Sequence, residues 1–153
     1  MEDSKLNIKV VHLVRDPRAA FYSGHKINNW DISVVKKCKK LKDDLKSFNI
    51  LKPKYKNRIM NISYEELMAD TYGKSKKLFS FLFGSDDLPK ETLKFILDHQ
   101  TTKEVKNTTY NTFRNTKTIL GSWKKNIDID LLNSIQNNPE CAYAINYLGY
   151  KFI

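Results

Sequence analysis

The feature that most constrains this chain is a short apolar run that stops at a charged turn. Residues 8–14 (Ile-Lys-Val-Val-His-Leu-Val) are mostly β-branched, which is typical of a strand covered on both faces in a parallel sheet. Asp16 is a good helix cap and Pro17 suits the first helical position, so a helix is predicted from there to about Lys26. The pattern therefore predicts a strand, a tight turn and a helix in direct succession.

A longer amphipathic helix is predicted after Asp31. Its apolar residues recur at helical spacing on one face, at Val34, Cys38, Leu41, Leu45 and Phe48. The lysines between them are available to water, so the lysine run is interpreted as the solvated side of this helix. Pro53 is expected to break the segment.

The rest of the chain predicts one more strand and several helices. Residues 58–62 are typical of a strand that runs into a helix beginning near Ser63. Residues 101–122 show no apolar period, and a long irregular segment of this kind is usually functional or disordered. The later helices are predicted at residues 72–83, at residues 90–99, after the cap Asp128, and from Asn138-Pro139 to a close at Gly149.

Length and charge limit the class of protein. At 153 residues with a globular composition, the chain is expected to be one domain and not a disordered segment. The formal net charge of +10 favours an anionic partner, which can be a nucleotide, an acidic glycan, a nucleic acid or a membrane surface. No nucleic-acid recognition fold or aromatic pair is recognisable, which argues against nucleic acid. The polar first residues predict neither a signal peptide nor a membrane span.

The turn after the first strand carries the most chemistry. An arginine, Arg15, ends the strand where the N-terminus of the next helix presents backbone N–H groups and the positive end of its dipole. Its guanidinium suits phosphate oxygens, and the hydroxyl of Ser23 is a candidate second donor. The alternative is that Arg15 and Asp16 form a surface ion pair beside a simple cap. The residues alone leave both interpretations open.

Four segments then resemble one family in the same order. Residues 9–19 (KVVHLVRDPRA), with Ser23 eight residues after Arg15, resemble the 3′-phosphate-binding segment of sulfotransferases, particularly the carbohydrate sulfotransferases of the Golgi. The other three segments are residues 62–67 (ISYEEL), residues 112–115 (TFRN) with residues 122–124 (SWK), and residues 141–150 from Cys141 to the closing LGY. The resemblance covers essentially the whole chain.

The resemblance implies a donor site for 3′-phosphoadenosine-5′-phosphosulfate and no metal. In that site Arg15 and Ser23 hold the 3′-phosphate, Arg114 supplies further positive charge, and Tyr64 lies near the nucleotide. Tyr64, at a strand end, is also a candidate core residue. Trp123 is expected to be a packing anchor, and His12 and His99 are expected to have structural roles; no catalytic base is identified.

The implied fold is a three-layer α/β/α parallel sheet of the P-loop nucleotide-binding type, of which this chain holds two strands and most of the C-terminal helices. Sulfotransferases begin with a glycine-rich turn that binds the 5′-phosphosulfate, and nothing in residues 1–153 resembles it. We therefore expect one partial domain, inactive by itself, from a longer enzyme that sulfates a glycan or proteoglycan. The alternative is a catalytically inactive truncated protein or a nucleotide- or glycan-binding module.

The resemblance also implies a compartment. The longer enzyme would be a Golgi protein held to the membrane by an anchor outside this chain, with its catalytic part in the lumen. Cys38 and Cys141 each lie on the apolar side of a predicted helix, as two buried thiols or as one lumenal disulfide, and the disulfide is favoured.

Overall fold

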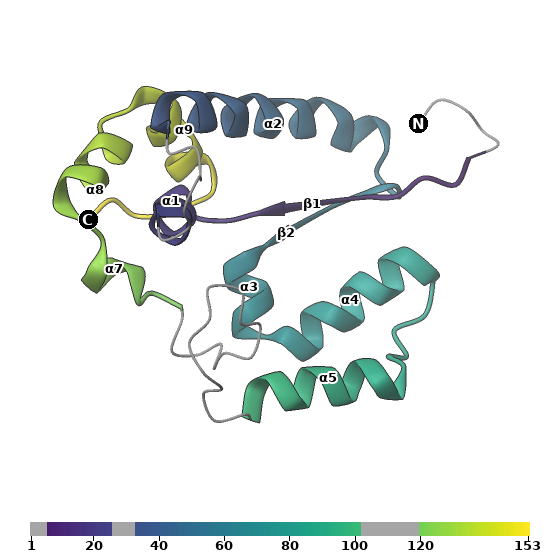
Figure 1. Cartoon of the computed structure of the whole chain (residues 1–153). Helices are drawn as coiled ribbons and strands as arrows, with labels where there is room; N and C mark the ends of the chain where they lie inside the picture. The colour runs from purple at the N-terminus through teal and green to yellow at the C-terminus, as the bar shows by residue number, and fades with distance from the viewer. Residues whose placement is uncertain (1–5, 26–32, 102–119) are drawn as a thin grey trace.

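The computed structural model describes residues 6–25, 33–101 and 120–153, and within these ranges the chain is an α/β protein with a two-stranded parallel sheet (Figure 1). In chain order the elements are β1 (Val10–Val14), α1 (Pro17–His25), α2 (Val34–Lys54), β2 (Ile59–Ser63), α3 (Tyr64–Ala69), α4 (Thr71–Phe83), α5 (Lys90–Thr101), α7 (Trp123–Asn126), α8 (Ile129–Gln136) and α9 (Pro139–Tyr147).

The two strands run in parallel, with Val10 opposite Ile59 and Val14 opposite Ser63. Parallel neighbours need a long crossover connection, and here the chain between them carries α1 and α2. The register brings the carboxyl ends of both strands to one edge of the sheet, where α1 follows β1 and α3 follows β2. Figure 1 shows α2 and α9 on one side of the strands and α3, α4 and α5 on the other.

Side-chain caps explain where most of the helices begin. The predicted caps Asp128 and Asn138 are confirmed, since their side chains accept hydrogen bonds from backbone N–H groups in the first turns of α8 and α9. Ser33, Ser63 and Asp70 cap α2, α3 and α4 in the same way. Ser63 is both the last residue of β2 and the cap of α3, so the strand passes into the helix without a loop.

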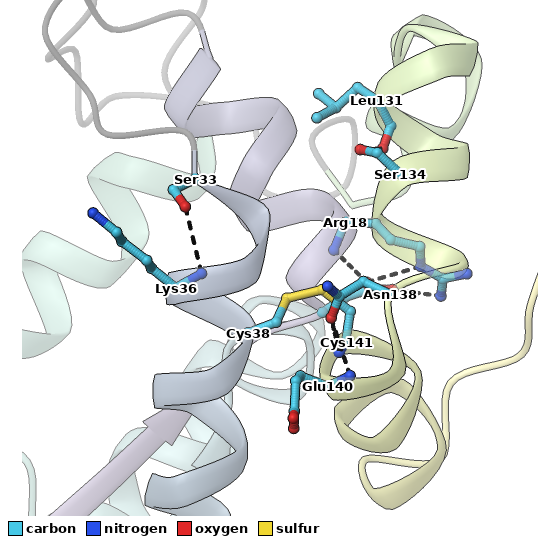
Figure 2. Close-up of a disulfide and its surroundings, with 10 residues drawn as sticks. Arg18, Ser33, Lys36, Cys38, Leu131, Ser134, Asn138, Glu140 and Cys141 are labelled. Carbon is cyan, nitrogen blue, oxygen red and sulfur yellow. Dashed lines mark hydrogen bonds and ion pairs between the residues drawn. A yellow bond between two sulfur atoms is a disulfide. The ribbon is translucent and has the colours of Figure 1, made fainter.

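The core lies between α1, α2, α8 and α9 and is closed by a disulfide. Cys38 on α2 and Cys141 on α9 are joined with their Cα atoms 4.9 Å apart, and both are almost fully buried (Figure 2). Phe21, Ile135 and Ile145 pack around them. Of the two alternatives for these cysteines, the structure has the disulfide.

Two smaller clusters extend this core. One joins Val14 of β1 to Leu45 of α2 and Ala144 of α9. The other joins Ala19 of α1 to Trp123 and Leu132. The end of β1 and the start of α1 are therefore held by the best-packed part of the molecule.

The structure corrects two expectations about these elements. First, β1 is not covered on both faces, because Leu13 is 55% exposed and Val10 is 39% exposed. β1 pairs with β2, and the described helices leave part of the surface of β1 open. Second, Pro53 does not stop α2, which continues to Lys54. Because Pro53 is one residue from the end, it removes one hydrogen bond of the last turn, and the helix ends just after it.

The helices α4 and α5 bury few side chains. Ile96 is the buried side chain among their described residues, while Phe83 is 71% exposed. The amine of Lys9, just before β1, donates to the carbonyls of Phe81 and Leu82 at 2.6 and 2.9 Å and so holds the C-terminal end of α4. Among the described residues, no helix has the length and apolar character that a membrane span requires.

Candidate functional site

Arg15 and Tyr64 meet at the edge where the two strands end. Val14 and Ser63 are the last paired residues of the two strands. Arg15 directly follows Val14 and Tyr64 directly follows Ser63, so the sheet register places Arg15 and Tyr64 side by side. The guanidinium carbon of Arg15 lies 4.4 Å from the centre of the Tyr64 ring. This distance is that of a cation–π contact, in which the ring orients the guanidinium plane.

Arg15 has unused hydrogen-bonding capacity. Its Nε atom is buried and has no hydrogen-bond partner within the described residues. Buried donors in proteins are almost always paired, and a guanidinium offers five N–H donors in a planar fork. Arg15 lies at the carboxyl edge of a parallel sheet, and an anion bound there would accept a hydrogen bond from this unpaired donor.

The helix terminus beside Arg15 is already occupied by the protein. The carboxylate of Asp16 accepts a hydrogen bond from the backbone N–H of Arg18 at 2.9 Å and so caps α1, as predicted. The backbone N–H of Asp16 itself donates to Glu65 at 3.1 Å. The expectation of free N–H groups here is therefore wrong for Asp16 and Arg18, and positive charge for an anion comes from the Arg15 side chain.

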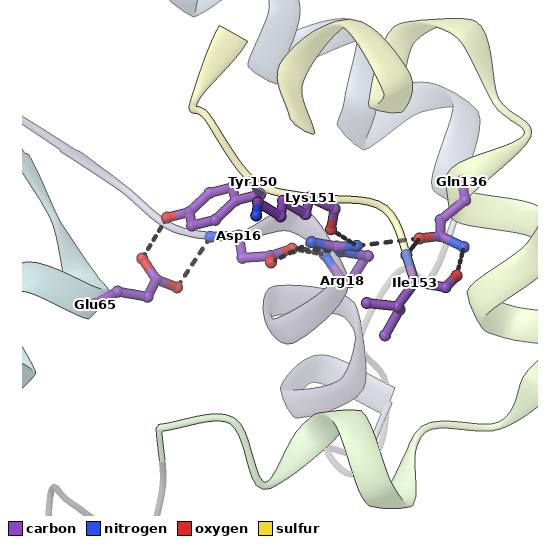
Figure 3. A network of polar contacts seen from close by, with 7 residues as sticks. All are labelled: Asp16, Arg18, Glu65, Gln136, Tyr150, Lys151 and Ile153. Carbon is purple, nitrogen blue, oxygen red and sulfur yellow. Dashed lines mark hydrogen bonds and ion pairs between the residues drawn. The ribbon is translucent and has the colours of Figure 1, made fainter. Parts of the chain in front are cut away.

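The ion pair in this turn joins Asp16 to Arg18, and not Asp16 to Arg15 as the alternative from the sequence had it. Asp16 pairs with Arg18 at 2.8 Å, and both side chains are almost completely buried. Arg18 also donates to the side chain of Gln136 and to the carbonyl of Lys151, at 3.0 and 2.9 Å (Figure 3). Arg18 therefore ties the first turn of α1 to α8 and to the C-terminal segment, and Arg15 remains outside this pairing.

Glu65 joins the ends of both strands to the C-terminal segment. One carboxylate oxygen accepts from the Asp16 N–H, and the other accepts from the Tyr150 hydroxyl at 2.6 Å (Figure 3). Partial burial and the hydrogen bond to the Glu65 carboxylate raise the pKa of Tyr150 above its usual value, so the hydroxyl stays protonated and donates. Sequence reasoning missed both residues, although the register of two parallel strand ends would have placed Glu65 beside Asp16.

The remaining predicted site residues lie at different places. Ser23 is on the second turn of α1, six residues after Pro17 and so roughly 9 Å further along the helix axis. Arg114 lies outside the described residues. Trp123 is buried, and the Arg18 guanidinium lies 5.0 Å from its ring, so its predicted role as a packing anchor is confirmed.

A cavity of about 210 Å³ opens beside Arg15, between the end of β1, α1 and α2. Its wall is largely apolar and includes Leu13, Ala20 and Phe21, with Arg15 and Lys37 as the cations that line it. An apolar wall beside a cation suits the body of an amphipathic group better than a phosphate alone.

Within the part of the chain that the structure describes, no metal site occurs and His12 has a structural environment. No group of His, Cys, Asp and Glu side chains suited to a metal ion occurs in the described parts of the chain. The His12 ring stacks on Phe48 with ring centres 5.0 Å apart, and its Nδ1 lies 3.0 Å from the side-chain oxygen of Asn61. The side chain of His99 lies outside the described residues.

Comparison with known proteins gives a consistent family. The family described as Sulfotransferase domain matches residues 3–140. Curated relatives include carbohydrate sulfotransferase 1 of Homo sapiens, 25% identical over 99% of this chain and 41% of the relative, and that of Danio rerio, 26% identical over 100% and 40%. Carbohydrate sulfotransferase 3 of Tetronarce californica is 23% identical over 100% of this chain and 38% of the relative. The chain thus spans about two fifths of the relatives' length, and no solved structure matches it.

Proposed function

Because this chain belongs to the sulfotransferase domain family, we propose that it contributes the 3′-phosphate side of a donor site for 3′-phosphoadenosine-5′-phosphosulfate in a carbohydrate sulfotransferase. The observation that carries this proposal is the Arg15 guanidinium, which lies over the Tyr64 ring and has a buried Nε without a partner among the described residues. A nucleotide with a terminal phosphate supplies both an acceptor for that donor and an aromatic base for a ring nearby.

The proposed residue roles are those that the resemblance to sulfotransferases implies. Arg15 and Ser23 bind the 3′-phosphate, Tyr64 contacts the nucleotide, and Arg114 adds positive charge. The bound donor supplies the sulfuryl group, which passes to a sugar hydroxyl by in-line displacement. The part played by the described residues is to bind and orient the nucleotide.

The donor's reactive end requires other residues. Neither described strand is followed by a glycine-rich turn: Arg15-Asp16-Pro17 follows β1 and Tyr64 follows β2. The proposed fold is a larger three-layer sheet of the P-loop type, to which β1 and β2 belong. The acceptor is a glycan or proteoglycan, and the compartment is the Golgi lumen, where the Cys38–Cys141 disulfide would be stable.

A second candidate is a nucleotide- or glycan-binding module without catalytic activity. The turns after β1 and β2 favour it, because neither offers a backbone loop for a 5′-phosphosulfate. An assay of sulfuryl transfer from the donor to an oligosaccharide, made with the longer protein that the first candidate requires, separates the candidates: turnover supports the enzyme, and nucleotide binding without turnover supports the module.

Calorimetric titration tests the site itself. The wild-type chain is titrated with adenosine 3′,5′-bisphosphate and with adenosine 5′-monophosphate, and the Arg15→Ala variant with the same two ligands. Loss of charge-assisted hydrogen bonds is expected to weaken the bisphosphate by roughly tenfold to a hundredfold and to leave the monophosphate nearly unchanged. Lys77→Ala, an exposed cation on α4, is the control for net charge. Equal loss for both nucleotides would contradict the assignment of Arg15 to the 3′-phosphate.

A further inference from the structure

The Glu65 carboxylate lies at a junction of three segments. It comes from α3, accepts from the Asp16 N–H after β1 at 3.1 Å, and accepts from the Tyr150 hydroxyl beyond α9 at 2.6 Å (Figure 3). All three residues are shielded from water to some degree, Asp16 almost completely. Two donors on one carboxylate hold both of its oxygens in place.

The sequence positions of these partners link the junction to the candidate site. The N–H that Glu65 accepts belongs to the planar peptide unit joining Arg15 to Asp16, so this bond fixes the backbone orientation of Arg15. Glu65 also directly follows Tyr64, the ring on which Arg15 stacks. The hydrogen bond from the Asp16 N–H to Glu65 therefore fixes the backbone of Arg15 relative to the backbone of Tyr64.

The junction also takes up the acceptor capacity of the Glu65 carboxylate. A carboxylate with free acceptor oxygens would compete for the N–H donors of the Arg15 guanidinium. The Tyr150 hydroxyl and the Asp16 N–H instead satisfy Glu65, so Arg15 keeps its place over the ring. Among the described residues the Arg15 Nε has no hydrogen-bond partner, which agrees with this division of partners.

We propose that Glu65 and Tyr150 are positioning residues for the anion site: Tyr150 holds the Glu65 carboxylate, and Glu65 holds the Arg15–Asp16 peptide so that the guanidinium lies over Tyr64 before a ligand binds. The ligand class is a nucleotide with a terminal phosphate, so this inference rests on the proposed function. It adds that the C-terminal segment, far from Arg15 in sequence, sets the affinity of the site.

A double-mutant cycle tests the inference with adenosine 3′,5′-bisphosphate as the ligand. Tyr150→Phe removes one hydroxyl and is expected to weaken binding by roughly fivefold in the wild-type background. If Tyr150 acts through Arg15, the same change has no further effect when Arg15→Ala is already present. An equal effect in both backgrounds, or none in the wild-type background, would overturn the proposal.

The chain offers a matched control in Tyr147. Its hydroxyl donates to the side chain of Asn49, in the C-terminal half of α2, so Tyr147→Phe removes a hydrogen-bonded hydroxyl outside the junction at Glu65. This variant is expected to leave affinity unchanged. Glu65→Gln is the second variant, since it keeps the side-chain shape. Melting temperatures of all variants identify any that fail to fold. If Tyr150→Phe fails to fold, Glu65→Gln replaces it in the cycle.

A measurement without nucleotide separates failure of this inference from failure of the proposed function. In NMR spectra of the unliganded chain, the Arg15 Nε–H resonance is expected to be shifted upfield by the Tyr64 ring. Tyr150→Phe should move it toward the position of a free arginine, and Tyr147→Phe should not. Absence of nucleotide binding by the wild type contradicts the proposed function, whereas an unmoved Arg15 resonance in Tyr150→Phe contradicts the positioning role.

Discussion

The two sides of the sheet differ in how they are held together. On one side, α1, α2, α8 and α9 share three buried clusters and a disulfide. On the other side, α4 and α5 contribute one buried side chain, Ile96, among their described residues. Arg15 belongs to the first side and Tyr64 to the second. The candidate site therefore joins a tightly packed region to a loosely packed one, and its geometry depends on the contacts between them.

Removing the disulfide should reduce this difference most. Cys38→Ala together with Cys141→Ala opens a covalent link across 103 residues, and we expect the free energy of unfolding to fall by about 4–5 kcal/mol, because the unfolded chain regains the entropy of that loop. Denaturant unfolding with and without reductant measures it. Wild type in reductant should match the double variant; a loss below 1 kcal/mol would show that packing alone holds α2 to α9.

Breaking the buried ion pair is the next largest change. Arg18→Ala leaves the Asp16 carboxylate buried without its cation and removes the contact with Trp123, so we expect a loss of about 3–4 kcal/mol. Lys76→Ala on α4 is the matched variant, because it removes a cation from an exposed pair with Asp86 2.9 Å away. Thermal unfolding should show no measurable change for Lys76→Ala. Equal effects would mean that burial does not distinguish the two regions.

Truncation of one buried side chain in each region sharpens the comparison. Leu45→Ala in α2 should cost about 3–4 kcal/mol, because the buried cluster it forms with Val14 and Ala144 has little freedom to collapse into the cavity. Ile96→Ala in α5 should cost about 2 kcal/mol, because Ile96 belongs to none of the three buried clusters and the adjacent Phe95 and Leu97 are exposed. Chemical denaturation measures both. A larger loss for Ile96→Ala would contradict the looser packing of α5.

The smallest expected effect is a pH dependence at the junction. Folding raises the pKa of Tyr150 above its unfolded value of 10.0, through burial and the bond to Glu65. The folded state thus favours the protonated hydroxyl, and the resulting stability is fully present below pH 10 and is lost as the pH rises above it. Wild type should therefore lose part of its advantage over Tyr150→Phe in unfolding experiments above pH 10. An advantage that stays constant up to pH 11 would contradict this assignment.

The sequence predicted local structure better than it predicted which strand faces are covered by other elements. The unit at Arg15-Asp16-Pro17 and the caps Asp128 and Asn138 follow from short-range chemistry, and the structure has them. The coverage of β1 depends on distant elements, so a run of apolar residues could not show that Leu13 is exposed.

The same limit applies to the candidate site. Arg15 and Tyr64 were identified from motifs, and the parallel register explains why they meet. The pairing of Asp16 with Arg18 could not be read from spacing, because it depends on α8 and the C-terminal segment closing over Arg18. The roles of Arg15, Ser23, Tyr64 and Arg114 toward a nucleotide remain predictions.

The disulfide also has a topological consequence. Cys38 and Cys141 close the intervening chain into a covalent ring that includes β2, α3, α4 and α5. A single peptide-bond cleavage anywhere in this ring leaves one molecule of nearly unchanged mass, which separates into two fragments only on reduction. A protease that cuts once between these cysteines would therefore nick the protein without releasing the part that carries Tyr64.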